Sequence, residues 1–241
     1  MAVQASSNDA AALIASARAQ GRTMLAEAEA KAFLAALGIP VPPGRIVRDG
    51  AAAAAALTQI GPPVVVKAVA HALAHKTDIG AVIFPIESPA AVEAACRTIA
   101  GRVAAARPDV TLDGFLNEAY RPGQPEWILA LRVDPDFGPA IMFGLGGIYV
   151  EALREVSFRL APLSERDIEA LLTERPAMRI LDGVRGRPRN DRAALRNVIG
   201  RLSDLALRPD IVDELSEIEI NPLVIGDGGA LALDALVVLR H

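Results

Sequence analysis

The sequence has 241 residues, enough for one large domain or for two lobes that each bury a core. Hydrophobic residues make up 52% of the chain and aromatic residues only 4%, so we expect a core of alanine and branched aliphatic side chains in an α/β arrangement. The formal net charge of −4, without a basic run, argues against nucleic acid as the main partner.

Cysteine usage and hydropathy narrow the class of protein further. Cys96 is the only cysteine, which excludes an internal disulfide and a cysteine-rich zinc site. Its apolar helical neighbours predict a buried thiol rather than a nucleophile. The N-terminus lacks a basic-then-apolar signal pattern, and no apolar run approaches the ~20 residues needed to span a bilayer. We therefore expect a cytoplasmic protein.

Helical segments and β-branched runs alternate along the whole chain, which is typical of an α/β protein. The predicted helices cover residues 8–20, 26–37, 51–60, 89–106, 165–173 and 191–207. The predicted strands cover residues 64–66, 79–86, 113–119, 126–133, 139–145, 155–161, 215–221 and 230–239, with a Gly-Asp-Gly-Gly turn at 226–229 before the last. Gly38 should end the second helix, whereas Ser164 and Asn190 should cap the starts of the last two. Lys67 should lie at the end of the first strand.

A glycine-rich loop at residues 144–147, Gly-Leu-Gly-Gly, lies between two apolar runs. Glycine lets backbone amides approach an anionic ligand closely, because no side chain intervenes. Further along the chain, Glu219 and Asn221 lie two residues apart and should share one strand face, and Asp234 follows in a second apolar run. Their oxygen atoms are suited to Mg²⁺. The combination predicts a protein that handles ATP.

Lys67 and the loop that follows it hold further candidates. At a strand end Lys67 could contact nucleotide phosphates, although a solvated surface lysine is the better reading of that residue alone. The loop at residues 71–80 contains His71 and His75, two of the three histidines. Imidazole is a good nucleophile near neutral pH and can carry a phosphoryl group transiently.

Six motifs occur in one order: Pro-Val-Val-Val-Lys at 63–67, His-Lys-Thr-Asp-Ile-Gly at 75–80, Asp-Pro-Asp-Phe-Gly-Pro at 134–139, Phe-Gly-Leu-Gly-Gly-Ile at 143–148, Val-Ser-Phe-Arg at 156–159 and Glu-Ile-Asn-Pro at 219–222. Together they resemble the β subunit, the ATP-grasp part, of ADP-forming acetyl-CoA and acyl-CoA synthetases, relatives of succinyl-CoA synthetase. The resemblance implies a two-lobed α/β ATP-grasp fold that binds Mg-ATP. The chain would divide into a helical segment at 1–22, a first lobe with the histidine loop at 23–113 and a second lobe with the glycine-rich loop and the Mg²⁺ site at 114–241.

The resemblance also implies a role for each candidate residue. His75 matches the family's His-Lys-Ser/Thr-Asp/Glu motif and would be the phosphohistidine carrier. Asp78 could orient the imidazole ring or stabilise its charged state, although an aspartate that caps the turn is an equally good reading. His71 falls where the family usually has serine and is read as non-catalytic. The residues implied to bind nucleotide are Lys67, Glu118, Gly146 and Gly147, and those implied to bind Mg²⁺ are Asn221, Asp234 and Glu219.

A partner is implied as well. In the family, a CoA-binding α subunit holds CoA and a phosphorylated histidine of its own, so we expect a hetero-oligomer. The reaction would be acid + CoA + ATP to acyl-CoA + ADP + phosphate. The resemblance leaves the acid, and the choice between ATP and GTP, open.

Departures from the family pattern keep other functions open. Ala81 stands where the family usually has a second glycine, Val133 stands where arginine is common, and a charged-Glu pair is reduced to Glu126 after Pro125. The alternatives are an ATP-grasp ligase that joins a carboxylate to an amine, and a catalytically silent nucleotide sensor or scaffold subunit. Structural readings without a binding role also stand: Glu118 as a solvent-facing carboxylate, Asn221 in an Asn-Pro turn and Asp234 in an edge strand. Arg159 and the Arg185-Gly186 pair match family positions that could contact phosphate or steady the phosphorylated loop, but arginines in a chain this rich in them are usually solvated.

Overall fold

The computed structural model describes residues 7–70, 73, 76–122, 125–147, 155–183, 190–226 and 229–240. The chain forms two compact units. The first unit spans Pro42–Pro122, and the second combines Val3–Val41 with Gly123–His241. Each unit contains helices and an antiparallel sheet, so the predicted α/β class is confirmed.

The boundaries of the units differ from those of the predicted lobes at two places. Residues 23–41 belong to the second unit, because the Leu25 amide donates to the Val237 carbonyl at 3.0 Å and the Ala232 amide donates to the Pro40 carbonyl at 2.9 Å. Residues 114–122 belong to the first unit, where β4 (Gly114–Ala119) pairs with two of its strands. These pairings join segments far apart in sequence, which composition does not reveal.

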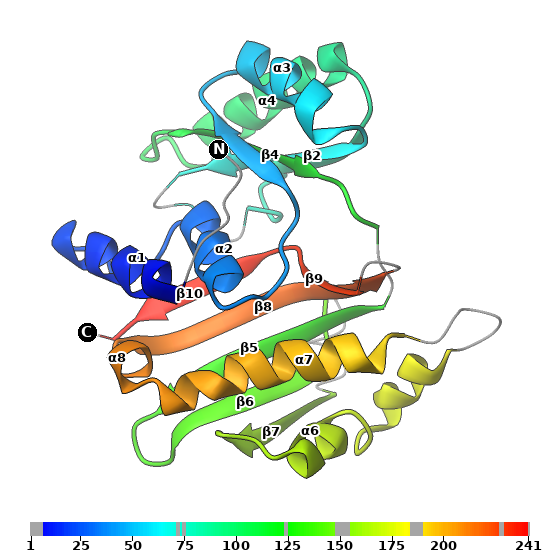
Figure 1. The fold of residues 1–241 in the computed structure, drawn as a ribbon. Coiled ribbons are helices and arrows are strands. Elements are labelled where there is room, and N and C mark those ends of the chain that lie inside the picture. Colours follow the sequence, from blue (N-terminus) through cyan, green and yellow to red (C-terminus); the bar gives the residue numbers. More distant parts are fainter. Residues whose placement is uncertain are drawn as a thin grey trace. The chain divides into compact units, whose positions relative to one another are not determined.

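The first unit is a four-stranded sheet with two helices packed against it. Its strands lie in the order β1-β4-β2-β3, and all neighbours are antiparallel. Helices α3 and α4 contact each other and the sheet (Figure 1). The elements, besides β4, are β1 (Gly44–Val47), α3 (Gly50–Ile60), β2 (Val64–Val69), β3 (Val82–Ile86) and α4 (Pro89–Ala106).

The second unit is built on a six-stranded antiparallel sheet with the order β10-β8-β5-β6-β7, in which β9 pairs with β8. Helix α7 crosses β5 and β6, and α1 and α2 pack together beside β10 (Figure 1). The helical elements are α1 (Ser7–Ala19), α2 (Glu27–Ala36), α6 (Glu165–Leu171), η1 (Pro176–Asp182), α7 (Arg192–Ser203), η2 (Asp204–Leu207) and α8 (Pro209–Val212). The strands are β5 (Glu126–Asp134), β6 (Gly138–Leu145), β7 (Val156–Leu160), β8 (Leu215–Gly226), β9 (Gly229–Ala232) and β10 (Ala235–Leu239).

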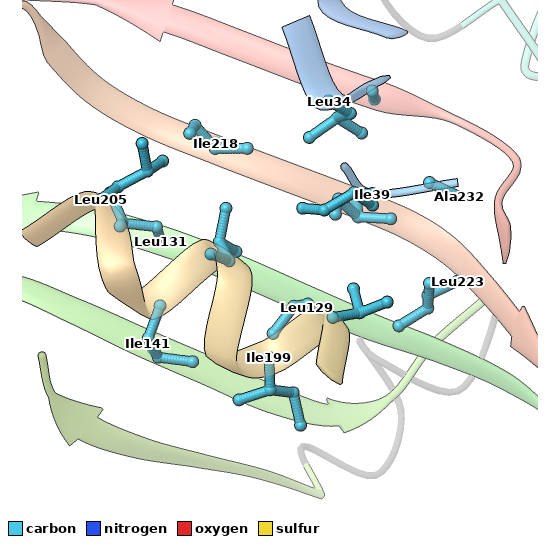
Figure 2. Packing of buried hydrophobic residues seen from close by; sticks show 14 of the residues in the cluster. Leu34, Ile39, Leu129, Leu131, Ile141, Ile199, Leu205, Ile218, Leu223 and Ala232 are labelled. Carbon is cyan, nitrogen blue, oxygen red and sulfur yellow. The ribbon is translucent and has the colours of Figure 1, made fainter. Parts of the chain in front are cut away.

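Aliphatic side chains fill the core of the second unit. Leu129 and Leu131 of β5, Ile141 of β6 and Ile218 of β8 are fully buried, and Figure 2 shows them within the same cluster of core side chains. Because side chains alternate along a strand, the residues between them lie on the opposite face of the sheet. That opposite face, which we call the acidic face, carries Glu126 at the start of β5 and Glu217, Glu219 and Asn221 on β8.

Most predicted elements are confirmed, with shifted ends. The helix predicted at 89–106 coincides with α4, and Gly38 ends α2 with a backbone φ of 74°. Ser164 and Asp167 form a capping box at α6. Two predictions were wrong: the last strand is divided into β9 and β10, and Asp191 rather than Asn190 caps α7 by accepting from the Ala194 amide at 3.0 Å. Strand β1 was not predicted, because its four residues give no pattern.

The Cys96 side chain is buried in α4, and this burial raises the pKa of the thiol to about 11, as expected for a structural cysteine. None of the helices within the described residues has both the length and the apolarity required to cross a bilayer.

Candidate functional site

Strand pairing brings the predicted Mg²⁺ ligands together on the acidic face. Ala235 of β10 pairs with Ile220 of β8, so Asp234 comes opposite Asn221. Glu219 lies one step along the same face of β8 and pairs with Leu236. The Asn221 side chain hydrogen bonds to Glu219 and accepts the Gly147 amide at 3.1 Å. These residues, separated in sequence, therefore form one cluster at the end of the glycine-rich loop.

The glycines of the loop are required by its own neighbours. A Cβ atom on Gly146 would lie 2.5 Å from the Trp127 carbonyl carbon, and the Gly146 amide donates to the Glu126 carbonyl at 2.8 Å. Gly147 has a φ of 60°, which side chains rarely adopt, and a Cβ there would lie 2.1 Å from Oε2 of Glu126. The expected reason was close approach of a ligand. The structure gives a second reason, which is the close packing of both glycines against Trp127 and Glu126 of the same chain.

Carboxylates on the acidic face are partly buried and mutually repulsive. Burial is the main cause that raises the pKa of Glu219, and the charges of Glu217 and Asp234 raise it further, whereas the hydrogen bond from Asn221 and the charge of Arg132 lower it. Burial also raises the pKa of Glu126. A cation placed among these groups would relieve both penalties.

The donor set fits a hard divalent cation. Within the described ranges, no three His, Cys, Asp or Glu side chains lie close enough to hold a metal ion by themselves. The candidate set is instead two carboxylates and one amide, Glu219, Asp234 and Asn221. Oxygen-only sets with one or two carboxylates are the kind that Mg²⁺ takes when phosphate oxygens complete its coordination.

Lys67 and Glu118 form a buried ion pair in the first unit. Lys67 lies within β2 rather than at its end, which corrects the prediction, and only 7% of the residue is exposed. Its Nζ lies 3.2 Å from Oε2 of Glu118 on β4, which is 2% exposed. Gly44 on β1 leaves room for the Glu118 side chain, since a Cβ at Gly44 would lie 2.6 Å from its Cγ. The readings as a solvated lysine and a solvent-facing carboxylate are therefore wrong.

The histidine assignments lie outside the described residues. This holds for His71, His75 and His241, and also for Arg185 and Gly186. Near the loop, the Ala81 amide donates to the Lys76 carbonyl at 2.8 Å, and Ala81 is fully buried in the core of the first unit. The methyl group that replaces the family's glycine is thus accommodated by apolar packing.

The arginine candidates bind carboxylates of the chain itself. Arg159 on β7 pairs with Glu174, and the Ser157 hydroxyl followed by the Arg159 guanidinium lowers the pKa of Glu174. Nη2 of Arg132 lies 3.4 Å from Oε2 of Glu217 on the neighbouring strand, while Val133 packs against the core. Arg132 and Val133 thus face opposite sides of β5, as the alternation along a strand predicts.

Sequence reasoning treated Glu126 only as the remnant of a reduced motif. The structure places its carboxylate against Gly147, beside the cluster of Glu219, Asn221 and Asp234. One signal in the sequence could have found it: a carboxylate directly before the buried Trp127, at the start of an apolar strand, must point to the other face of the sheet.

A family model and several known proteins match most of the chain. A family model described as an ATP-grasp domain matches residues 16–239. The acetate–CoA ligase (ADP-forming) I subunit beta of Pyrococcus furiosus is 39% identical over 227 residues, covering 94% of this chain and 96% of that protein.

Solved structures extend the likeness to the whole fold. The dinucleotide forming acetyl-coenzyme A synthetase 1 of Ca. Korarchaeum cryptofilum, in complex with coenzyme A, Ca-AMPCP and HgCl+, has a TM-score of 0.91 at 37% identity and covers 95% of this chain and 99% of its own. A second structure of that enzyme, with coenzyme A and Mg-AMPPCP and with its phosphohistidine segment pointing towards the nucleotide binding site, has a TM-score of 0.83 at 35% identity and covers 96% of this chain and 100% of its own.

Proposed function

We propose that this chain, which belongs to the ATP-grasp family of β subunits of ADP-forming acyl-CoA synthetases, is the nucleotide-binding subunit of such an enzyme. The reaction is acid + CoA + ATP to acyl-CoA + ADP + phosphate. The observation that carries the proposal is the cluster on the acidic face, where the Gly147 amide, Asn221, Glu219 and Asp234 adjoin one another.

Mg²⁺ would be held by Asn221, Asp234 and Glu219, and when bound it supplies positive charge that offsets the charge of the transferring phosphoryl group. In this proposal Gly146 and Gly147 contribute backbone amides beside the phosphates. In the structure the Gly147 amide donates to Oδ1 of Asn221. Ligand binding would break that hydrogen bond. The Gly147 amide would then be available to the phosphates, and Oδ1 of Asn221 to the metal.

Lys67 and Glu118 are assigned to nucleotide binding. Their burial in the first unit supports a role beyond surface charge, because a buried ion pair contributes little net stability compared with apolar side chains of similar size. Lys67 would contact a phosphate oxygen, and Glu118 would keep the ammonium group charged and oriented.

His75 is assigned as the phosphoryl carrier, and the assignment rests on the family motif. Its imidazole attacks the γ-phosphorus of ATP in one direction of the reaction, the bond from phosphorus to the bridging oxygen breaks, and ADP leaves with the bonding electron pair. The phosphoryl group then passes to a CoA-binding α subunit, which the name of the relative as a subunit beta supports. We also propose that the protein is cytoplasmic.

The test is a labelling experiment with γ-labelled ATP, Mg²⁺ and a cognate α subunit. We expect acid-labile label on His75, and we expect His75→Ala to retain Mg-ATP binding while phosphoryl transfer and acyl-CoA formation are lost. His71→Ala is the matched control and should keep most activity. Label on another residue would refute the assignment of His75, and a chain that binds no Mg-nucleotide would refute the proposed function as a whole.

A further inference from the structure

Glu126 is a carboxylate that the proposed reaction does not use, yet it lies against the glycine-rich loop. Its Oε2 occupies the space where a Cβ on Gly147 would be, at 2.1 Å from that position. Among the described residues no lysine, arginine or histidine forms an ion pair with it. Burial without a compensating cation raises its pKa.

The loop is held from two sides by backbone and side-chain groups. On one side the Gly146 amide donates to the Glu126 carbonyl at 2.8 Å, and on the other side the Gly147 amide donates to Oδ1 of Asn221 at 3.1 Å. Trp127 points into the core, so alternation along β5 puts the Glu126 side chain on the acidic face with Asn221 and Glu219. A phosphate that reaches the Gly147 amide therefore comes within a few ångströms of the Glu126 carboxylate.

From this arrangement we infer that Glu126 is a specificity-determining residue, which makes nucleotide binding at the glycine-rich loop depend on a divalent cation. The inference rests on the proposed function, because it assumes that phosphates bind beside Gly147. A nucleoside triphosphate without bound metal brings several negative charges to a face that already carries Glu126, Glu219 and Asp234. Like charges at short range repel strongly in a partly buried site. The metal complex of the same nucleotide brings a cation that these carboxylates attract.

A carboxylate at this position weakens the binding of the metal-free nucleotide more than it strengthens the binding of the metal complex. Free nucleotide would otherwise occupy the loop without the metal that the transfer of a phosphoryl group requires. Glu126 is assigned neither to the phosphoryl transfer nor to the metal, so its effect should be seen in binding selectivity before it is seen in turnover.

The experiment measures the dissociation constants of ATP in EDTA and of Mg-ATP by calorimetry at neutral pH, for the full chain and for two variants. Glu126→Gln keeps the size of the side chain and removes its charge. Asp134→Asn is the matched control: it removes a carboxylate charge at the other end of the same strand, about 27 Å away along β5. Its side-chain oxygen can still accept the amides of Asp136 and Phe137.

We expect Glu126→Gln to tighten the binding of metal-free ATP by roughly tenfold, with Mg-ATP changed by less than about threefold. The Asp134→Asn variant should leave both constants unchanged. Equal weakening of both ligands by Glu126→Gln, or no change in either, would overturn the inference. If Glu126→Gln fails to fold, Glu126→Ala should show the same selective tightening, and its absence would count against the inference equally. Failure of the wild-type chain to bind Mg-ATP at all would instead contradict the proposed function.

Discussion

In the β2–β4 region of the first unit the buried charges compensate each other, whereas on the acidic face of the second unit several carboxylates share one side of a sheet. Nζ of Lys67 and Oε2 of Glu118 lie 3.2 Å apart, and both residues are almost fully buried. On the acidic face, burial together with Glu217 and Asp234 raises the pKa of Glu219, and burial raises that of Glu126. The first arrangement is complete without a ligand, while the second would be relieved by a cation.

This difference separates two ways in which charged residues serve a binding site. A paired lysine is kept charged and oriented by its own chain, so its loss should be felt even in the absence of ligand. A repulsive carboxylate cluster reduces the stability of the chain without ligand, so removing one of its carboxylates should raise that stability and lower the further gain that a bound cation gives.

Replacing Lys67 by methionine should destabilise the chain by about 3–5 kcal/mol, because it removes the ammonium group that lies 3.2 Å from the buried Glu118 carboxylate. Urea unfolding measures this difference. The control is Arg97→Met, which breaks the exposed pair with Glu93 at 3.8 Å in the same unit and should cost at most about 1 kcal/mol. The double variant Lys67→Met/Glu118→Gln should recover part of the loss, and equal costs for the buried and the exposed pair would contradict the contrast.

Asp234→Asn should remove much of the stabilisation that Mg-nucleotide gives, while the ligand-free chain stays folded. A ligand bound only by the native state stabilises it by ~2.7 kcal/mol at a hundredfold excess over its dissociation constant. Thermal unfolding with and without saturating Mg-ATP measures the effect. Asp136→Asn, on the exposed turn between β5 and β6, is the control and should respond like the wild type. A full response of the Asp234→Asn variant would show that this carboxylate does not serve the cation.

Glu219→Gln should stabilise the ligand-free chain at neutral pH by a few tenths to about 1 kcal/mol, a value reduced by solvent screening of a half-buried group. Because the folded chain raises the pKa of Glu219 above the ordinary value of 4.5, ionisation of this group weakens the folded state as the pH rises through that raised pKa. The variant and the wild type should therefore be equally stable at acidic pH and diverge above the ordinary pKa. Urea unfolding across this pH range is the measurement.

The opposite order of stabilities at neutral pH, with Glu219→Gln weaker than the wild type, would mean that the hydrogen bond from Asn221 outweighs the repulsion. In saturating Mg-nucleotide the sign should reverse, because the variant loses a carboxylate that a bound cation would attract. This reversal distinguishes a binding cluster from a cluster that is merely poorly solvated.

Particular elements show how far the sequence alone determined this protein. Periodicity, helix caps and β-branched runs predicted α4, α6 and the strands β4 to β7 closely, since each depends on local patterns. The ordered motifs, with Asp234, predicted that the glycine-rich loop, Asn221, Glu219 and Asp234 belong to one site, and the structure places them near one another. That they bind Mg²⁺ stays a prediction. The pattern of a single segment was enough to predict a helix or strand wherever neighbouring residues in the sequence decide its conformation.

Only the tertiary structure decided which distant segments meet. The pairing of Ala235 with Ile220 places Asp234 opposite Asn221, and the β2–β4 register buries Lys67 beside Glu118, where the sequence placed the lysine at a strand end. The packing of Glu126 against Gly147 is of the same kind, because it depends on where β5 and the end of β6 come together. Local propensity fixes the elements, whereas the register between strands and the burial of charge follow from long-range pairing, which a single sequence leaves implicit.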